Sequence, residues 1–295
     1  MTEPRPHPTR ALAAALLAAL ALACGDAAPV APTGPVGGEE RPVEVFVPST
    51  YDGTKAMPLV LLLHSYSING AIAEAAFGFK PVAESSGFLL AIPEGLRDAR
   101  NFPYWNATSG CCDFNDSGVD DSGYLRRVIE DVQARWKVDR KRVFTIGVSN
   151  GGFMGHRMAC DHADLVAGIV SIAGATHLDP SLCRPRDAVH VLHIHGTADS
   201  VIHFDGGTFT GPYPSAPESV ARWVELDGCG TSEPWPMLDV DSFAPGAETR
   251  VTRWGDCRPG GSVEFWEMVG ADHYFFPTAE FKRVIVEWFF SHPKD

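Results

Sequence analysis

The sequence has few basic side chains for its acidic content, and its apolar runs are short. Lys and Arg number 24 against 37 Asp and Glu in 295 residues, and the basic side chains form no run or stripe. Proteins that bind nucleic acid need such a positive patch to contact phosphates, so no nucleic-acid partner is expected. The apolar run at residues 11–23 has 13 residues, whereas a helix that spans a bilayer needs about 20. A permanent transmembrane helix is therefore not expected from this run.

The same run follows a basic start, as in a signal peptide. Arg5 and Arg10 precede an Ala- and Leu-rich stretch, which predicts an export signal over residues 1–23. Cys24 follows the tripeptide Ala-Leu-Ala, which resembles a bacterial lipobox, although the first position is more often Leu. Two alternatives stay open: lipidation of Cys24, or plain cleavage beside an incidental cysteine. Either predicts an exported protein, secreted or held as a periplasmic or outer-surface lipoprotein, with membrane contact only through Cys24.

Residues 24–41 are rich in Pro, Gly and Ala and lack both the helical and the strand period. They predict a flexible linker, followed by one globular domain at residues 42–295. Loss of residues 1–23 would remove Arg5, Arg10 and Glu3, leaving 22 basic and 36 acidic side chains. The expected exported domain is therefore strongly acidic.

Cysteine spacing typical of zinc sites is absent, so no metal site is expected. Six cysteines follow the linker, and an even number in an exported chain favours disulfides. Six cysteines allow 15 pairings, which sequence alone does not resolve. Two pairs are favoured because each brackets one compact segment, and the remaining two neighbours could form a vicinal bridge. These pairs are Cys160 with Cys183, Cys229 with Cys257, and Cys111 with Cys112.

Short apolar runs alternate with helical patterns along the domain. Such alternation predicts an α/β fold with a mainly parallel central sheet flanked by helices. In such sheets reactive groups lie at the carboxyl ends of strands. The predicted strands are residues 43–47, 59–63, 88–92, 143–147, 168–172, 189–194 and 263–269, and the predicted helices are 71–86, 124–136, 151–160, 218–226 and 279–290.

A nucleophile motif stands at the end of one predicted strand. Gly147-Val148-Ser149-Asn150-Gly151 is a G-x-S-x-G sequence that leads directly into a predicted helix. The strand-to-helix turn is so sharp that only glycine fits two residues on either side, and the serine hydroxyl is left exposed. Ser149 is therefore the predicted nucleophile. The alternative is a glycine-rich turn in which Ser149 merely caps the helix.

A serine nucleophile needs a base, and the base needs an acid that fixes its tautomer. In α/β-hydrolases the chain order is Ser, then Asp or Glu, then His. Asp199 follows the strand at 189–194 and is the predicted acid, with Asp205 as the alternative. His273 follows the last predicted strand and is the predicted general base. The three remaining histidines near these strands are expected to be structural and hydrogen-bonded: His156, His193 and His195.

The oxyanion that forms during acyl transfer needs two backbone N–H groups. One should come from Asn150, directly after the nucleophile, and the other from the loop after the strand at 59–63. We expect the N–H of Tyr66 there, with Ser65 as the alternative.

Several spaced motifs accompany these residues: Trp105-Asn106-Ala107, Cys111-Cys112, Val119-Asp120-Asp121, Ser149-Asn150-Gly151-Gly152, residues 193–199 and a final Gly-x-x-His. In this combination the chain resembles the secreted polyhydroxybutyrate depolymerase and feruloyl esterase family over roughly residues 43–291. The resemblance implies an α/β-hydrolase fold and a serine esterase without a cofactor. Its substrates would be feruloyl or acetyl esters of plant polysaccharide, or polyhydroxyalkanoate oligomers.

Two departures from that family concern the site. The oxyanion loop reads His64-Ser65 where the family usually has His-Gly, and His273 is followed by Tyr-Phe-Phe-Pro where the family tends to have Thr-Trp-Pro. Trp105 and Phe276 are candidate substrate contacts, although aromatic residues are more often core. A serine peptidase of the same fold and a non-catalytic polymer-binding module are the alternative functions.

Overall fold

The computed structural model describes residues 1–2 and 34–295. The predicted signal peptide beyond residue 2 lies outside the described residues. So do residues 24–33 of the predicted linker, which include the candidate lipidation site Cys24. Within the described residues, every helix is too short or too polar to cross a bilayer.

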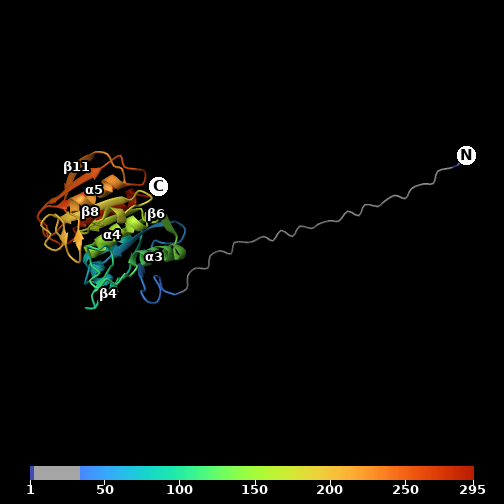
Figure 1. The fold of residues 1–295 in the computed structure, drawn as a ribbon, viewed down its shortest axis with the longest axis horizontal. Helices are drawn as coiled ribbons and strands as arrows, with labels where there is room; N and C mark the ends of the chain where they lie inside the picture. Colours follow the sequence, from blue (N-terminus) through green and yellow to red (C-terminus); the bar gives the residue numbers. More distant parts are fainter. Residues whose placement is uncertain (3–33) are drawn as a thin grey trace. The chain divides into compact units, whose positions relative to one another are not determined.

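A nine-stranded sheet forms the centre of residues 34–295 (Figure 1). The strand order is β1-β3-β2-β6-β7-β8-β13-β12-β11. The run from β3 to β13 in this order is parallel, while β1, β12 and β11 pair antiparallel at the two sides. The strands are β1 (Glu44–Phe46), β2 (Met57–Leu63), β3 (Leu89–Ile92), β6 (Val138–Val148), β7 (Gly168–Ile172), β8 (His190–Gly196), β11 (Ser232–Leu238), β12 (Thr249–Trp254) and β13 (Ser262–Met268). The predicted mainly parallel sheet is confirmed.

Two short antiparallel pairs stand apart from this sheet. They are β4 (Leu96–Arg97) with β5 (Pro103–Tyr104), and β9 (Gly207–Thr208) with β10 (Pro212–Tyr213). Both lie in loops that lead from carboxyl ends of sheet strands towards the next helix.

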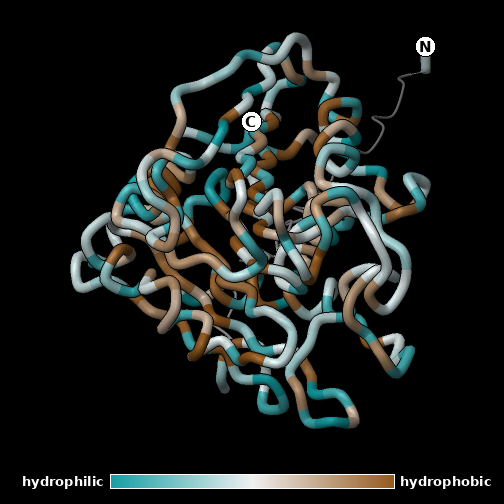
Figure 2. The backbone as a smooth tube through the Cα atoms, turned by 90° about the vertical axis from the view of Figure 1, so that its left-hand side faces the viewer, coloured by the Kyte–Doolittle hydropathy of each residue, from teal (hydrophilic) through white to brown (hydrophobic). Residues whose placement is uncertain are grey.

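Helices cover both faces of the sheet. Alternate side chains of a strand point to opposite faces, and β2 illustrates this: Leu59 and Leu61 pack into the cluster that contains α3, α4 and α5, whereas Val60 and Leu62 pack with α1, α2 and α6. Figure 2 shows the hydrophobic segments gathered inside and hydrophilic turns around them. The helices are α1 (Gly70–Phe77), α2 (Phe79–Ser86), α3 (Asp121–Arg135), α4 (Asn150–Asp161), α5 (Ala216–Leu226) and α6 (Ala279–Ser291).

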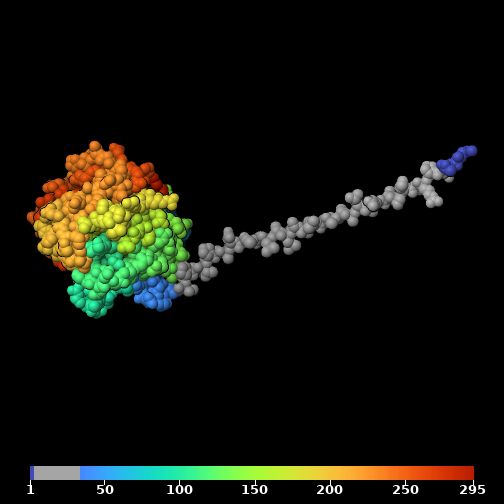
Figure 3. All heavy atoms as spheres, viewed as in Figure 1, coloured from blue at the N-terminus to red at the C-terminus, as the bar shows by residue number. Residues whose placement is uncertain are grey.

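Two features differ from the sequence prediction of elements. The helix predicted at 71–86 is two helices, because Gly78 adopts a left-handed φ of 64° and ends α1. The strands β11 and β12 were not predicted. β11 contains Pro234 and Pro236 and is largely exposed, so it lacks the apolar pattern of a buried strand. Figure 3 shows the orange residues of this region on the surface at one side of the domain.

The last part of the predicted linker belongs to the folded domain. Val36 is 5% exposed and lies in the main core cluster. The Arg41 guanidinium is 2.8 Å from the Asp121 carboxylate and stacks over the Tyr124 ring at 3.6 Å. The prediction of a flexible linker is therefore wrong for residues 34–41, since a short apolar anchor and one arginine fix this segment without any helical or strand period.

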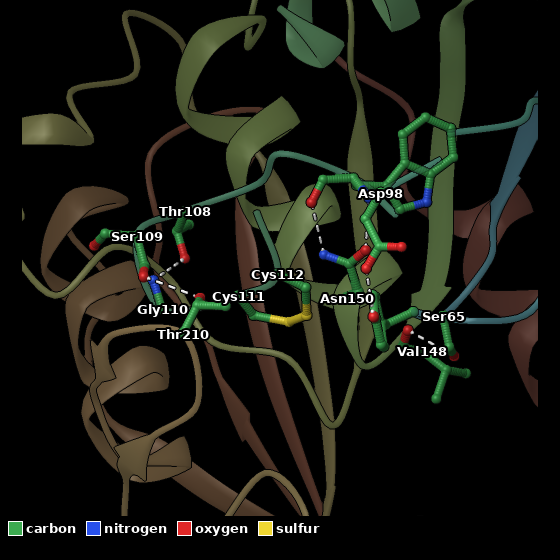
Figure 4. Close-up of a disulfide and its surroundings, with 12 residues drawn as sticks. Ser65, Asp98, Thr108, Ser109, Gly110, Cys111, Cys112, Val148, Asn150 and Thr210 are labelled. Carbon is green, nitrogen blue, oxygen red and sulfur yellow. Dashed lines mark hydrogen bonds between the residues drawn. A yellow bond between two sulfur atoms is a disulfide. The ribbon is translucent and has the colours of Figure 1, made fainter. Parts of the chain in front are cut away.

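The three disulfides are those that the sequence favoured. Cys160 at the end of α4 is bonded to Cys183, and Cys229 after α5 is bonded to Cys257 after β12. The neighbouring Cys111 and Cys112 form the vicinal bridge (Figure 4). The first two bonds join cysteines 23 and 28 residues apart, and closing loops of such length stabilises a fold by about 3 to 4 kcal/mol per bond in the chain-entropy account.

Candidate active site

Ser149 occupies the sharp turn between β6 and α4. Its backbone is at φ 55° and ψ −120°, a left-handed conformation that costs a non-glycine residue energy. A Cβ at Gly147 would come within 2.5 Å of the Gly151 backbone, and one at Gly151 would overlap the Leu63 carbonyl oxygen. Only glycine at these two positions lets the turn close against β2.

The Ser149 side chain is not used for helix capping. It stands at the N-cap position of α4, yet its hydroxyl makes no capping hydrogen bond. The capping interpretation is therefore wrong, and the hydroxyl lies on the wall of a pocket that His273 also lines.

His273 is paired with Asp199 across the ends of β8 and β13. Its Nδ1 is 2.8 Å from Asp199 Oδ2. Because a carboxylate only accepts, Nδ1 carries the proton and Nε2 keeps its lone pair. The alternative acid, Asp205, has an exposed side chain. The geometry thus places Asp199, and not Asp205, against the candidate base.

The Asp199 carboxylate is buried and well supplied with donors. Its second oxygen, Oδ1, accepts the N–H groups of Val201 and Ile202 at 2.9 and 2.8 Å. Burial alone would raise the pKa of Asp199, but hydrogen bonds from His195 and His273 and from the Val201 N–H outweigh it and hold that pKa well below its usual range. Asp199 is therefore ionised at neutral pH.

The loop after β2 reaches the start of α4. Ser65 Oγ donates to the Val148 carbonyl at 3.1 Å, so the serine that replaces the expected glycine ties this loop to the residue before Ser149 (Figure 4). The Ser67 N–H is occupied, since it donates to Pro103 O at 2.9 Å. Asn150 is the first residue of α4, where a backbone N–H has no acceptor within the helix. Tyr66 and Asn150 thus lie on the two segments that would supply oxyanion donors.

The pocket has a volume of about 250 Å³ and a largely apolar wall. Besides Ser149 and His273, its lining includes six aromatic side chains: Tyr66, Phe77, Phe209, Tyr274, Phe275 and Phe276. Tyr274 and Phe276 remain 73% and 49% exposed. Sequence analysis did not name Phe209, and it identified Tyr274 directly after His273 without assigning it as a substrate contact.

Trp105 does not line this pocket, which corrects its assignment as a substrate contact. Its side chain is fully buried, its Nε1 donates to His64 O at 3.0 Å, and its backbone pairs with both ends of the Asn150 amide at 2.7 and 2.9 Å. Trp105 therefore holds His64 and Asn150, on the two segments next to Ser149, without reaching the pocket. Nothing in the sequence distinguishes this role from that of a pocket residue.

His64 is a supporting residue that sequence analysis missed. Its Nδ1 donates to Ser65 O at 2.9 Å, and its Nε2 accepts the Gly95 N–H at 2.8 Å. Burial lowers the pKa of His64 to about 4, so the ring is neutral and has one donor and one acceptor to spend on these bonds. The available signal was its place at the carboxyl end of β2.

Within residues 34–295, no three His, Cys, Asp or Glu side chains are grouped so that they could hold a metal ion.

Comparison with known sequences finds esterases. A family described as phospholipase/carboxylesterase matches residues 91–217. Feruloyl esterase B of Piromyces equi is 28% identical over 207 residues, which cover 66% of this chain and 37% of that protein. Feruloyl esterase C of Emericella nidulans is 26% identical over 219 residues, covering 68% of this chain and 75% of that protein. The chain spans less than half the length of the first curated relatives that it matches.

Comparison with solved structures agrees on the fold. The acetyl xylan esterase from Aspergillus awamori superposes with a TM-score of 0.60 at 17% identity, over 84% of this chain and 93% of that chain. The predicted fold class and the predicted resemblance to feruloyl esterases are thereby confirmed. The chain therefore has the α/β-hydrolase fold, and its sequence is similar to those of feruloyl esterases.

Proposed function

We propose that the protein is a serine esterase that works through an acyl-enzyme. His273 Nε2 takes the proton of Ser149 Oγ while that oxygen attacks the ester carbonyl carbon, and Asp199 stabilises the resulting imidazolium. The N–H groups of Tyr66 and Asn150 stabilise the oxyanion. The imidazolium then protonates the departing alcohol. A water molecule, deprotonated by His273, releases the acid from Ser149.

The observation that carries this proposal is that Ser149 and His273 line one pocket. Ser149 lies on a strained turn and makes no capping hydrogen bond, and His273 Nδ1 is 2.8 Å from Asp199 Oδ2. The relatives named as esterases favour an ester over a peptide bond as the target. Binding alone would not require a strained backbone at Ser149 or an ionised, buried carboxylate at Asp199, so these features favour catalysis over a non-catalytic binding module.

Ser149→Ala tests the proposal directly. Removing Oγ deletes the nucleophile, so hydrolysis of p-nitrophenyl acetate should fall by about 10⁶-fold or to background. Circular dichroism and thermal melting should match the unmodified protein, because the hydroxyl caps nothing. Activity within tenfold of the unmodified protein would disprove the role of Ser149.

For the substrate we propose carboxylic esters of plant polysaccharide or of polyhydroxyalkanoates, with aromatic acyl groups preferred. Support comes from the pocket wall, where Tyr66, Phe209, Tyr274 and Phe276 offer ring faces and no charged side chain to an acyl group. A planar feruloyl group can stack on such rings, whereas an acetyl or hydroxybutyryl group covers little of them. Two of the relatives above are named feruloyl esterases.

Parallel hydrolysis of methyl ferulate, acetylxylan and hydroxybutyrate oligomers measures this preference. We expect the highest kcat/KM for methyl ferulate and a fall of about tenfold in Phe276→Ala through KM, since that change removes ring contact without touching the reacting atoms. A higher kcat/KM on either of the other substrates would reassign the acyl group.

We also propose that residues 1–23 direct export and that Cys24 carries a lipid anchor. Three disulfides suit an oxidising compartment. Expression of the full chain in a bacterial host and partition into detergent should place the unmodified protein in the lipid phase and Cys24→Ser in the aqueous phase. Aqueous partition of both would leave plain cleavage as the correct alternative.

A further inference from the structure

Three buried histidines outside the catalytic site are linked in a row. His156 on α4 and His193 and His195 on β8 are each 1% exposed or less. His156 Nε2 lies 3.2 Å from His193 Nδ1, and His193 Nε2 lies 3.3 Å from His195 Nδ1. Trp223 Nε1, on α5, lies 2.9 Å from His156 Nδ1. The row thus crosses the interior from α5 to the carboxyl end of β8.

The row ends at the loop that carries Asp199. His195 Nε2 is 2.7 Å from Ile202 O and 3.4 Å from Asp199 Oδ2. Ile202 also donates its N–H to Asp199 Oδ1 at 2.8 Å. His195 therefore contacts both the loop backbone that holds one carboxylate oxygen and, more weakly, the other oxygen, which accepts from His273.

The two ends of the row allow only one direction of hydrogen bonding. An indole N–H donates and cannot accept, and a carbonyl oxygen accepts and cannot donate. A neutral imidazole between them has one donor and one acceptor. Every link is satisfied only if His156, His193 and His195 all carry their proton on Nε2.

His156 and His193 also stay uncharged. Burial lowers the pKa of His156 to about 3 and the pKa of His193 well below its usual range. The titratable groups next to the row are His177 beside His156, and Asp199 with His273 at the other end. Phe265 and Phe204 pack against the His193 and His195 rings. A second proton on any of the three would place two donors face to face in this apolar setting.

We propose that Trp223, His156, His193 and His195 form a hydrogen-bond chain of fixed direction that positions Asp199, with His195 as its terminal positioning residue. The proposal rests on the function proposed above, because it concerns the acid of that triad. The chain holds His195 as the Nε2–H tautomer, this tautomer ties down the loop at Ile202, and the Asp199 carboxylate is thereby kept in line with His273. None of the three histidines exchanges a proton with substrate.

The first test compares two substitutions of His195. In His195→Leu the donor is lost, Asp199 loses its fixed position, and kcat on p-nitrophenyl acetate should fall by about 10- to 100-fold, the usual effect of a misplacement near 1 Å. KM should change by less than about threefold, since no pocket residue is altered. His195→Gln retains an N–H near the Nε2 position and should recover most of kcat.

His190 provides the matched control on the same strand. It is also buried, but it bonds Ser262 Oγ at 2.9 Å and Pro293 O at 3.1 Å, at the end of β8 away from Asp199. His190→Leu should lower the melting temperature much as His195→Leu does, while kcat at 25 °C stays within about twofold. Equal kcat losses in the two leucine variants, or no recovery in His195→Gln, would overturn the positioning role.

The second test needs no activity and no substitution. ¹⁵N NMR of histidine-labelled full-length protein should report His156, His193 and His195 as neutral Nε2–H tautomers throughout about pH 5 to 8, the range in which an ordinary histidine titrates. An Nδ1–H tautomer or a titration in any of the three would disprove the chain. Because the NMR result does not depend on hydrolysis, loss of the proposed function and loss of this inference are distinguishable.

Discussion

At the scale of single residues, Asp199 shows how one carboxylate is fixed through both of its oxygens. Oδ1 accepts two backbone N–H groups from its own loop, and Oδ2 accepts His273 Nδ1. The backbone bonds orient the carboxylate, and its charge fixes the tautomer of His273. These two tasks can be separated by substitution.

Asp199→Asn separates them. The amide oxygen can still accept the Val201 and Ile202 N–H groups, so the loop should keep its course. The amide N–H₂ can donate to His273 Nδ1, which would move the histidine proton to Nε2 and remove the base. We expect kcat on p-nitrophenyl acetate to fall by about 10³- to 10⁴-fold, as in the Ser-His-Asp template, with a near-native melting temperature.

Asp205→Asn is the matched control for that substitution, because Asp205 lies six residues later and is exposed. Its kcat should stay within about twofold of the unmodified protein. A larger loss in Asp205→Asn than in Asp199→Asn would mean that the acid has been misassigned.

At the scale of elements, the loop after β2, which carries the proposed oxyanion donor Tyr66, is fixed by several side-chain contacts. Ser65 Oγ bonds Val148 O, Tyr66 Oη bonds Asp98 Oδ2 at 2.7 Å, and His64 bonds the Ser65 carbonyl. The backbone around the proposed donor, the Tyr66 N–H, is therefore held by hydrogen bonds of Ser65 and of the Tyr66 side chain. The Ser65 hydrogen bond reaches Val148, the residue before Ser149.

Ser65→Ala removes the anchor nearest to Ser149. A neutral hydrogen bond contributes about 1 kcal/mol to stability, so the free energy of unfolding in urea should drop by no more than that. The kcat on p-nitrophenyl acetate should fall by about 3- to 10-fold, because the oxyanion donor loses its fixed position.

Ser85→Ala is the comparison for Ser65→Ala. Ser85 Oγ also donates to a carbonyl at 3.1 Å, that of Val82, but it does so on the exposed surface of α2. Its removal should leave kcat unchanged. If Ser65→Ala behaves in the same way, the loop does not depend on this anchor.

The elements that the sequence predicted well are those with a strong local pattern. The mostly apolar runs of β2, β7 and the second half of β6 stand out because both faces of these strands are buried. β11 has no such apolar run, because its side chains are mostly exposed and it is held by pairing with β12.

The residues of the candidate site likewise divide into those with a local sequence signal and those without one. Ser149 and His273 could be predicted because a turn motif and a strand end are local features of sequence. Trp105 and His64 could not be assigned, since their roles depend on segments up to 45 residues away along the chain. The same holds for the directed row of histidines, whose two ends come from different elements.

At the scale of the whole molecule, α5 and β8 are joined by a buried carboxylate. Asp227 follows α5, its side chain is fully buried, and Oδ1 accepts the Val189 N–H at 3.3 Å at the start of β8. Oδ2 has no hydrogen-bond partner among residues 34–295, and the Arg258 guanidinium approaches Oδ1 only to 3.6 Å. Burial accordingly raises the pKa of Asp227 to about 7, against the lowering effect of the Val189 and Arg258 contacts.

This raised pKa makes stability depend on pH in a defined direction. In the folded protein Asp227 binds a proton up to about pH 7, whereas in the unfolded chain it loses that proton near pH 4. Between these values Asp227 binds more protons in the folded state, so its own contribution to the free energy of unfolding should decrease as pH rises, by a few kcal/mol over the whole interval. Asp227→Asn keeps the acceptor for Val189 and removes the titration. In urea unfolding at pH 5 and pH 8, we expect the variant to be close to the unmodified protein at pH 5 and more stable than it at pH 8. A variant that is less stable at pH 8 would show instead that the Arg258 contact stabilises the ionised carboxylate by more than burial disfavours it.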